Sequence, residues 1–243
     1  MIHSASPRPR GLLLGALAAL AVFVLMAAHL RLSPVPITQP LDDAWRGAVG
    51  ADSPVGGPVF WFFEQFGYGV GYATLAAVGV LLLATGRLWT LAFVLLSALA
   101  GPGLISQGTK NLIDRPRPAG DPTLGLYGPW VAVDHGSFPS GHALTMGFAV
   151  VAIGILLPVA HRRWWSWVAV VLCLGMVWQR TLANAHWLSD TLFGALAGAA
   201  VTIVVWYLLY PPVTAERALP WRWGWRADGL RQRPGSASGD LTS

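Results

Sequence analysis

The stretch Pro139-Ser140-Gly141-His142-Ala-Leu-Thr-Met-Gly-Phe-Ala-Val-Val-Ala-Ile-Gly-Ile-Leu-Leu-Pro-Val-Ala160 joins a polar tetrapeptide directly to an apolar run. Two more polar islands border apolar runs: Lys110-Asn-Leu-Ile-Asp-Arg-Pro-Arg117-Pro118 and Arg180-Thr-Leu-Ala-Asn-Ala-His186-Trp-Leu-Ser-Asp190. An apolar run of about twenty residues can cross a bilayer as a helix, because a helix satisfies its own backbone hydrogen bonds in lipid. The pattern therefore predicts an all-α membrane protein with polar groups at the ends of its helices.

The composition separates the chain from ordinary soluble domains. Of its 243 residues, 54% are hydrophobic and 11% are charged, whereas soluble domains carry about 25% charged residues. The net charge of +5 does not indicate a nucleic-acid partner, because the Lys and Arg residues lie mainly between apolar runs and at the termini. The single Cys173 allows neither a disulfide framework nor a Cys-based metal site.

Six apolar runs predict a bundle of six transmembrane helices in one membrane domain, residues 1–243. The predicted spans are 11–30, 68–86, 88–107, 142–160, 164–183 and 190–210. The first run could also be a signal peptide, but it is longer than the apolar core of about 7–15 residues that signal peptides have. Residues 211–243 contain several Arg residues and predict a basic cytoplasmic tail.

Shorter features modify this plan. Residues 41–46 predict a surface helix with an acidic first turn. The aromatic residues 59–63 predict a segment in the headgroup layer of the membrane. The sequence Gly101-Pro102-Gly103 predicts a kink near the end of the third span.

The distribution of Arg residues predicts the orientation. An even number of spans places both termini on one side of the membrane. That side collects basic residues, which indicates the cytoplasm: Arg8, Arg10, Arg87, Arg162 and Arg163. The three polar islands then face the periplasm or exterior from an inner or plasma membrane.

The first island supplies cations at the membrane boundary. Lys110 and Arg117 are seven positions apart, about two helical turns, but the prolines on either side of Arg117 indicate that a helix does not continue to the end of the island. Charges at such places are costly unless they serve a ligand or a pathway. The alternative is that a side chain only extends to lipid headgroups. This is the interpretation for Arg115, which could also contact Asp114.

The second island combines an anion site with an imidazole. Free N–H groups at a helix start bind anions, and Gly141 permits a close approach. Ser140 could contribute to this site or could simply cap the helix. His142 could donate a proton to a leaving oxygen near neutral pH.

The third island adds a planar cation and a second imidazole. Arg180 carries a guanidinium fork suited to phosphate oxygens. Asp190 lies four residues after His186, so its carboxylate could fix the imidazole tautomer and leave the other ring nitrogen free to attack phosphorus. Asp190 could instead cap the last span. His135, in the loop between the first two islands, is a further candidate for lining the site.

Together, and in this order, the islands resemble the motifs of the type-2 phosphatidic acid phosphatase superfamily, which also includes the vanadium-dependent haloperoxidases. The matching positions are Lys110-x6-Arg117-Pro118, Pro139-Ser140-Gly141-His142 and Arg180-x5-His186-x3-Asp190. Each motif alone is weak, whereas the three in order at the edges of apolar runs are specific. The resemblance extends from the second span to the sixth. One departure is Gln179, where the family usually has Ser; Gln can also donate a hydrogen bond.

The resemblance implies a lipid phosphatase and assigns roles. His186 would be the nucleophile that forms a phosphohistidine, Asp190 would orient it, and His142 would protonate the leaving group. The remaining site residues would bind phosphoryl oxygens, so neither a metal nor a cofactor is expected: Lys110, Arg117, Ser140, Gly141 and Arg180.

The substrate expected from the resemblance is a membrane lipid phosphate, of the undecaprenyl pyrophosphate, phosphatidylglycerophosphate or phosphatidate class. A lipid phosphotransferase would use the same residues. A transporter of anions or lipids is a third alternative, although it does not need His186 followed by Asp190. Haloperoxidase chemistry is typical of soluble relatives. The sequence leaves the oligomeric state open.

Overall fold

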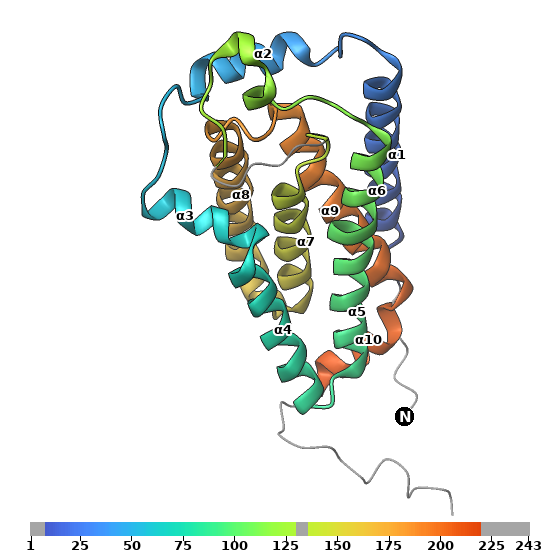
Figure 1. The fold of residues 1–243 in the computed structure, drawn as a ribbon. Helices are drawn as coiled ribbons and strands as arrows, with labels where there is room; N and C mark the ends of the chain where they lie inside the picture. Colours follow the sequence, from blue (N-terminus) through green and yellow to red (C-terminus); the bar gives the residue numbers. More distant parts are fainter. Residues whose placement is uncertain (1–7, 130–135, 220–243) are drawn as a thin grey trace, which may run out of the picture.

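A computed structural model describes residues 8–129 and 136–219, and every regular element within these ranges is a helix (Figure 1). The helices of the bundle lie side by side: α1 (Arg10–Leu32), α4 (Gly69–Ala84), α5 (Leu88–Ala98), α7 (Gly141–Leu156), α8 (Val159–Leu182) and α9 (Leu188–Leu208). The short helices are α2 (Gln39–Val49), α3 (Pro58–Glu64), α6 (Ser106–Leu112), α10 (Tyr210–Ala218), and the single turns η1 (Gln65–Gly67), η3 (Pro118–Gly120) and η4 (Pro122–Leu124). The expected all-α fold is confirmed for the described residues.

The centre of the bundle is the pair α7 and α9, which glycines bring into close contact. A Cβ atom added to Gly147 of α7 would lie 2.1 Å from the carbonyl oxygen of Ala195, and one added to Gly198 of α9 would lie 2.0 Å from that of Leu144. Small residues let helix backbones approach closely where lipid offers no hydrophobic driving force. The two helices that carry the second and third islands are therefore fixed tightly against each other.

A helix occupies each of the six predicted spans, but their lengths differ from the expectation. Four helices are long and apolar enough to cross a membrane, and the bent pair of Pro58–Gly67 with Gly69–Ala84, at 59°, gives up to five. The central helix α7 has 16 residues, fewer than a typical span needs. The count of six spans therefore remains a prediction.

The boundary between the fourth and fifth spans was predicted wrongly. Helix α7 ends at Leu156, before 160, and α8 begins at Val159, before 164. Leu157 and Pro158 lie between the two helices, and the Pro158 ring is incompatible with a continuous helix but suits a helix start. The polar His161-Arg162-Arg163 sequence consequently lies in the first turns of α8.

The third span contains the expected irregularity. Residues Leu99–Ile105 form the π-helical segment η2 with Pro102 inside it, and the helix then continues through α6 to Leu112. Pro102 has no N–H to donate, so the local hydrogen-bond pattern widens. The continuation to Leu112 carries Lys110 to the last helical turn.

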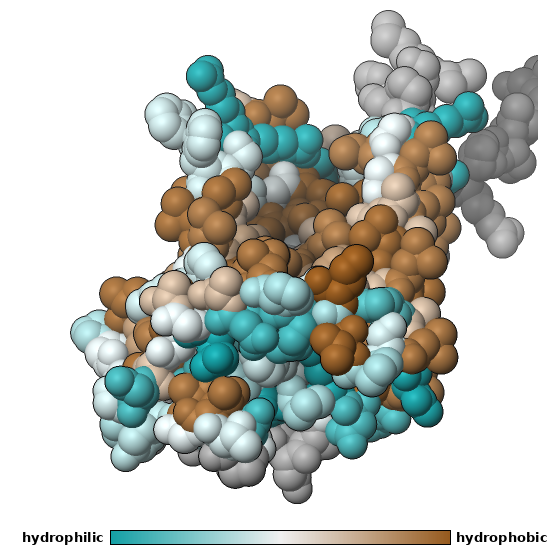
Figure 2. Space-filling view, turned by 90° about the horizontal axis from the view of Figure 1, so that it is seen from above, coloured by the Kyte–Doolittle hydropathy of each residue, from teal (hydrophilic) through white to brown (hydrophobic). Residues whose placement is uncertain are grey.

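The two ends of the bundle differ in character. One end bears α2, η3, η4 and the starts of α7 and α9, and Figure 2 shows hydrophilic residues gathered over it with hydrophobic residues around them. The opposite end bears the first described residues, the α4–α5 turn and α10 (Figure 1). The three islands therefore open on the same end, which the sequence predicted.

The start of the predicted tail is an ordered helix. Arg87 donates to the carbonyl oxygens of Glu216 and Leu219 at 2.7 and 2.9 Å. The Glu216 carboxylate in turn accepts from the N–H groups of Trp89 and Thr90, each at 2.8 Å, which caps the start of α5. These hydrogen bonds hold α10 against the α4–α5 turn. The rest of the predicted tail, residues 220–243, lies outside the described part of the chain.

Candidate active site

The predicted cations of the first and third islands lie close together, which requires residues up to seventy positions apart to meet. Lys110 Nζ lies 3.9 Å from the position of a Cβ atom on Gly141, so the first island reaches the start of α7. Arg117 Nη1 donates to the carbonyl oxygen of Ala185 at 2.8 Å and lies 3.5 Å from His186 Nε2. Burial lowers the pKa of Arg117, and the neighbouring positive charge of Arg180 lowers this pKa further. Lys110, Arg117 and Arg180 are called the cation triad below.

His186 is held in one tautomer by the backbone. Its Nδ1 lies 2.7 Å from the carbonyl oxygen of Ser137, so Nδ1 carries the proton and donates it to that oxygen. The neutral ring then has its lone pair on Nε2, which faces Arg117. Burial holds the pKa of His186 well below its ordinary value, and the cation triad lowers it further. The side chain is 3% exposed and remains a neutral base at neutral pH.

Asp190 does not touch His186 in the expected way. Its Oδ2 lies 3.8 Å from His186 Nδ1, which is too long for a hydrogen bond. Instead Oδ2 accepts from Ser137 Oγ at 2.7 Å and from the N–H of Trp187 at 2.9 Å. Asp190 therefore fixes Ser137 and the start of α9, and Ser137 fixes the imidazole. Asp190 thus stabilises the start of α9, and it supports His186 indirectly, through Ser137.

The interpretation of Arg115 as a headgroup contact or a partner of Asp114 was wrong. Arg115 is 5% exposed, and its Nη1 donates to Asp190 Oδ1 at 2.6 Å and to Ser189 Oγ at 2.8 Å. Its Nη2 donates to Asp42 Oδ2 at 2.8 Å. Arg115 follows the end of α6 at Leu112, and Pro116 favours an extended backbone at this position.

Asp42 is a site residue that the sequence did not indicate. This residue of α2 is 1% exposed and accepts from the N–H and the Oγ of Ser189 at 2.8 and 2.7 Å, as well as from Arg115. Residues 41–46 do form part of a helix, but one of its two acidic residues, Asp42, is buried rather than solvated. Asp42, Arg115, Ser189 and Asp190 are called the Arg115 network below.

Ser140 of the second island caps a helix, which is one of the two roles that the sequence left open for it. Ser140 is the N-cap of α7, and its Oγ accepts from the N–H of Ala143 at 3.4 Å. Its own N–H donates to the carbonyl oxygen of Asp190 at 3.1 Å, which joins the starts of α7 and α9. The buried Oγ of Ser106 has no hydrogen-bond partner among the described residues and lies 3.4 Å from the position of a Cβ on Gly141. The helix start thus offers polar groups close to Lys110.

His142 faces a turn that follows α3. Its Nε2 lies 3.2 Å from the carbonyl oxygen of Glu64, and the ring of Tyr68 contacts the imidazole edge-on with centroids 5.3 Å apart. A Cβ atom on Gly67 would lie 2.1 Å from His142 Nε2. Only glycine permits this approach of the backbone to the ring.

Glu64 is the second site residue that was missed. Its Oε2 accepts from Arg180 Nη1 and from Gln179 Nε2. Gln179 therefore does donate a hydrogen bond, as expected, and its partner is this carboxylate. Glu64 and Arg180 are 2% and 3% exposed. Arg180 Nε is buried without a hydrogen-bond partner among the described residues.

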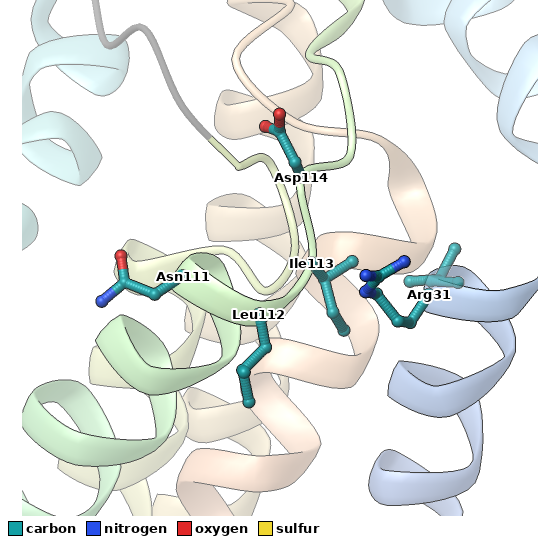
Figure 3. Close-up of a pocket in the computed structure, with 6 residues that line it drawn as sticks. Arg31, Asn111, Leu112, Ile113 and Asp114 are labelled. Carbon is teal, nitrogen blue, oxygen red and sulfur yellow. The ribbon is translucent and has the colours of Figure 1, made fainter.

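Other features of this end are separate from the cluster. A pocket between the ends of α1 and α6 is lined by none of the predicted site residues (Figure 3). Its lining residues are Leu30, Arg31, Asn111, Leu112, Ile113 and Asp114. Within residues 8–129 and 136–219, no three His, Cys, Asp or Glu side chains are grouped so that they could hold a metal ion. His135 lies outside the described residues.

The helices and their composition define an integral membrane protein, and comparison with known families makes this more specific. Residues 87–212, more than half of the chain, match the model of the PAP2 superfamily. The chain belongs to the PAP2 superfamily. The resemblance drawn from the three motifs is thereby confirmed.

Individual relatives agree with this family. The chain is 30% identical over 118 residues to a lipid A 1-phosphatase of Rhizobium johnstonii, an alignment that covers 47% of this chain and 44% of the relative. The match thus spans less than half of that relative's length. The fold resembles the crystal structure of a transmembrane PAP2-type phosphatidylglycerolphosphate phosphatase from Bacillus subtilis, with a TM-score of 0.59 and 20% sequence identity over 85% of this chain and 98% of that one.

Proposed function

We propose that this protein is an integral membrane lipid phosphatase that acts through a phosphohistidine on His186. The observation that carries the proposal is the state of this imidazole: Nδ1 donates to the Ser137 carbonyl, and Nε2 is left with its lone pair beside Arg117. A neutral, buried imidazole with one fixed nitrogen is a nucleophile prepared for attack. The names of the two relatives, both phosphatases, support this direction.

The reaction has two steps that return the residues to their starting state. His186 Nε2 attacks phosphorus, the bond from phosphorus to the lipid oxygen breaks, and His142, which has taken up a proton from solvent as the phosphate binds, gives that proton to the lipid oxygen. A water then attacks the phosphohistidine, transfers its proton to His142, and breaks the bond from phosphorus to nitrogen. Inorganic phosphate leaves, and both imidazoles regain their initial protonation.

The cation triad supplies the electrostatic stabilisation in this proposal. The Lys110 ammonium makes no hydrogen bond or ion pair with any described residue, and Arg180 has an unused Nε, so both can bind phosphoryl oxygens. Arg117 lies beside the attacking nitrogen. Fixed donors aimed at developing charge are worth several kcal/mol in a site that excludes water, on the order of 3 kcal/mol for one donor. The N–H of Gly141 and the Oγ of Ser140 complete the cradle, and we propose that no metal ion is required.

The location of the site supports a lipid substrate. The cluster lies at one end of a helical bundle whose sides expose many large hydrophobic side chains, so an acyl or prenyl chain can stay in the bilayer while the phosphate enters. The basic residues Arg87 and Arg162 belong to the opposite end, at the α4–α5 turn and the start of α8, which favours a periplasmic or exterior site with both termini in the cytoplasm.

A panel assay tests the proposed activity. Purified protein in detergent micelles is incubated with phosphatidate, phosphatidylglycerophosphate, lipid A, and prenyl mono- and diphosphates, with and without a chelator, in water enriched in oxygen-18. The proposal predicts release of phosphate that contains one solvent oxygen, unchanged by the chelator, and no release by His186→Ala or His142→Ala. Transfer of phosphate to a second lipid without solvent oxygen would identify a phosphotransferase instead. Absence of release from every lipid would refute the proposal.

A further inference from the structure

Residues 64–68 form one wall of the candidate site, although they belong to none of the three islands. Glu64 ends α3, and its carboxylate lies on Arg180 and Gln179 while its carbonyl oxygen accepts from His142 Nε2. The segment is held on both sides. The Phe63 ring packs so closely on α8 that a Cβ on Gly175 would lie 2.1 Å from it, and Gly67 lies against the His142 ring. The Glu64 carboxylate is thus a fixed part of the site.

This carboxylate changes the charge that a substrate meets. The cation triad contributes three positive charges, and Glu64 cancels one of them by direct contact with Arg180. Both side chains of that pair are almost fully buried, at 3% and 2% exposure, so solvent screens their interaction little. The residues that line the site therefore present two positive charges.

The charged groups behind the residues that line the site do not add positive charge to it. In the Arg115 network, one guanidinium lies between the carboxylates of Asp42 and Asp190, at 2.8 and 2.6 Å. One positive and two negative charges leave this network with a net charge of minus one. Counting both imidazoles as neutral before the substrate binds, the site balances a dianion at most, and a group with three negative charges exceeds it.

The pairing also limits how Arg180 can bind. A free guanidinium presents two parallel N–H groups to an oxyanion. Here Glu64 occupies Nη1, while Nε is buried without a partner among the described residues. Arg180 can therefore offer its Nε edge to one phosphoryl group, and the carboxylate excludes a second phosphate from the Nη1 side by charge repulsion.

We infer that Glu64 is a specificity-determining residue that sets this site to accept lipid phosphomonoesters and to disfavour lipid diphosphates. The inference rests on the proposed phosphatase function and narrows its substrate class. A phosphomonoester carries two negative charges near neutral pH, which match the two positive charges that line the site. A diphosphate monoester carries three, and its outer phosphate would meet the Glu64 carboxylate.

The test compares two probes that share one lipid chain, farnesyl monophosphate and farnesyl diphosphate. For each probe, kcat/KM for phosphate release is measured with the wild type, Glu64→Gln and Asp52→Asn. The Glu64→Gln amide oxygen can still accept from Gln179 and Arg180, but the negative charge is gone. Asp52→Asn removes an exposed carboxylate outside the cluster and controls for the overall charge of the protein.

The wild type is expected to prefer the monophosphate. In Glu64→Gln the ratio of kcat/KM for diphosphate over monophosphate should rise by about tenfold, because one unit charge acts at short range in a buried site. Asp52→Asn should leave the ratio unchanged. A wild type that prefers the diphosphate, or a ratio that stays within about twofold in Glu64→Gln, would overturn the inference, since a merely structural role lowers both rates together.

A binding measurement separates this inference from the proposed function and from loss of folding. Inorganic phosphate and pyrophosphate are titrated calorimetrically into the wild type and into Glu64→Gln. Tighter binding of phosphate than of pyrophosphate by the wild type supports the inference even if no lipid is hydrolysed. Tighter binding of pyrophosphate by the wild type contradicts it while leaving a phosphatase activity intact.

Discussion

Replacing Asp42 by Asn tests whether α2 supports the candidate site from outside the three motifs. One oxygen of Asp42 accepts from the N–H of Ser189, and Asn retains this acceptor. The other oxygen accepts from Arg115 Nη2 at 2.8 Å and from Ser189 Oγ at 2.7 Å. In the variant an amide NH₂ group replaces that oxygen and faces two donors, so both hydrogen bonds are lost.

The magnitude follows from the burial of these groups. A hydrogen bond to a charged partner contributes about 1.5–3 kcal/mol and a neutral one about 0.5–1.5 kcal/mol, so the loss comes to roughly 3 kcal/mol. The cost of about 3–5 kcal/mol for stranding a buried charge is an upper bound, because Arg115 keeps Asp190 as a partner. A displaced Arg115 also releases Asp190 and Ser137, so kcat should fall about tenfold to a hundredfold.

The assay is reversible unfolding in mixed micelles of dodecyl maltoside and SDS, together with kcat on the best lipid of the panel. The neighbour Asp43 provides a matched control, because its side chain is exposed and, among the described residues, accepts from Gln39 alone, at 3.1 Å. Asp43→Asn should change the free energy of unfolding by less than about 0.5 kcal/mol. If Asp42→Asn unfolds and turns over like Asp43→Asn, the support assigned to α2 is refuted.

Four other predictions follow from contacts described above. Because burial and the cation triad lower the pKa of His186, kcat/KM should fall on the acid side with a midpoint below the ordinary value of about 6.5. Because the pKa of His186 is lower in the folded protein, the unfolded state binds more protons as the pH falls. The contribution of His186 to the free energy of unfolding is therefore complete above about pH 6.5 and is lost at lower pH. Unfolding titrations that show greater stability in acid would contradict this prediction. Arg117→Lys should lower kcat by at least about tenfold despite its conserved charge, because the fork that bonds Ala185 beside the nucleophile is lost, and unchanged kinetics would limit Arg117 to a surface role. Glu216→Ala should lower the free energy of unfolding by about 1–2 kcal/mol through loss of the α5 cap while kcat stays at the wild-type value, and equal stability would show that the α10 contact is unimportant.

The sequence predicted the helices and the islands because both leave local patterns. Apolar runs mark the helices, and the motif spacings put Lys110, His142 and His186 at helix ends that open on the same end of the bundle. The sequence also indicated the irregularity at Pro102. It predicted the end of the fourth span poorly, since residues 157–160 are as apolar as a span while Pro158 breaks the helix.

The residues that the sequence could not indicate are single charges with distant partners. Asp42 bonds Ser189 across 147 positions, and Glu64 bonds Arg180 across 116. No periodicity or spacing connects such residues, and each lies in a stretch whose local composition suggests a membrane surface. Arg115 was misjudged for the same reason, because only the packing of α2 over the helix ends makes its position a buried one.

Trapping the phosphorylated enzyme tests the central claim that His186 is the nucleophile. The wild type and His186→Ala are mixed with a lipid labelled with phosphorus-32, quenched in base within one turnover, and digested for mass spectrometry. The account predicts label on the peptide that contains His186, stable in base and lost in acid, and no label in the variant. Product formation without labelled protein, or label on another residue, would contradict it.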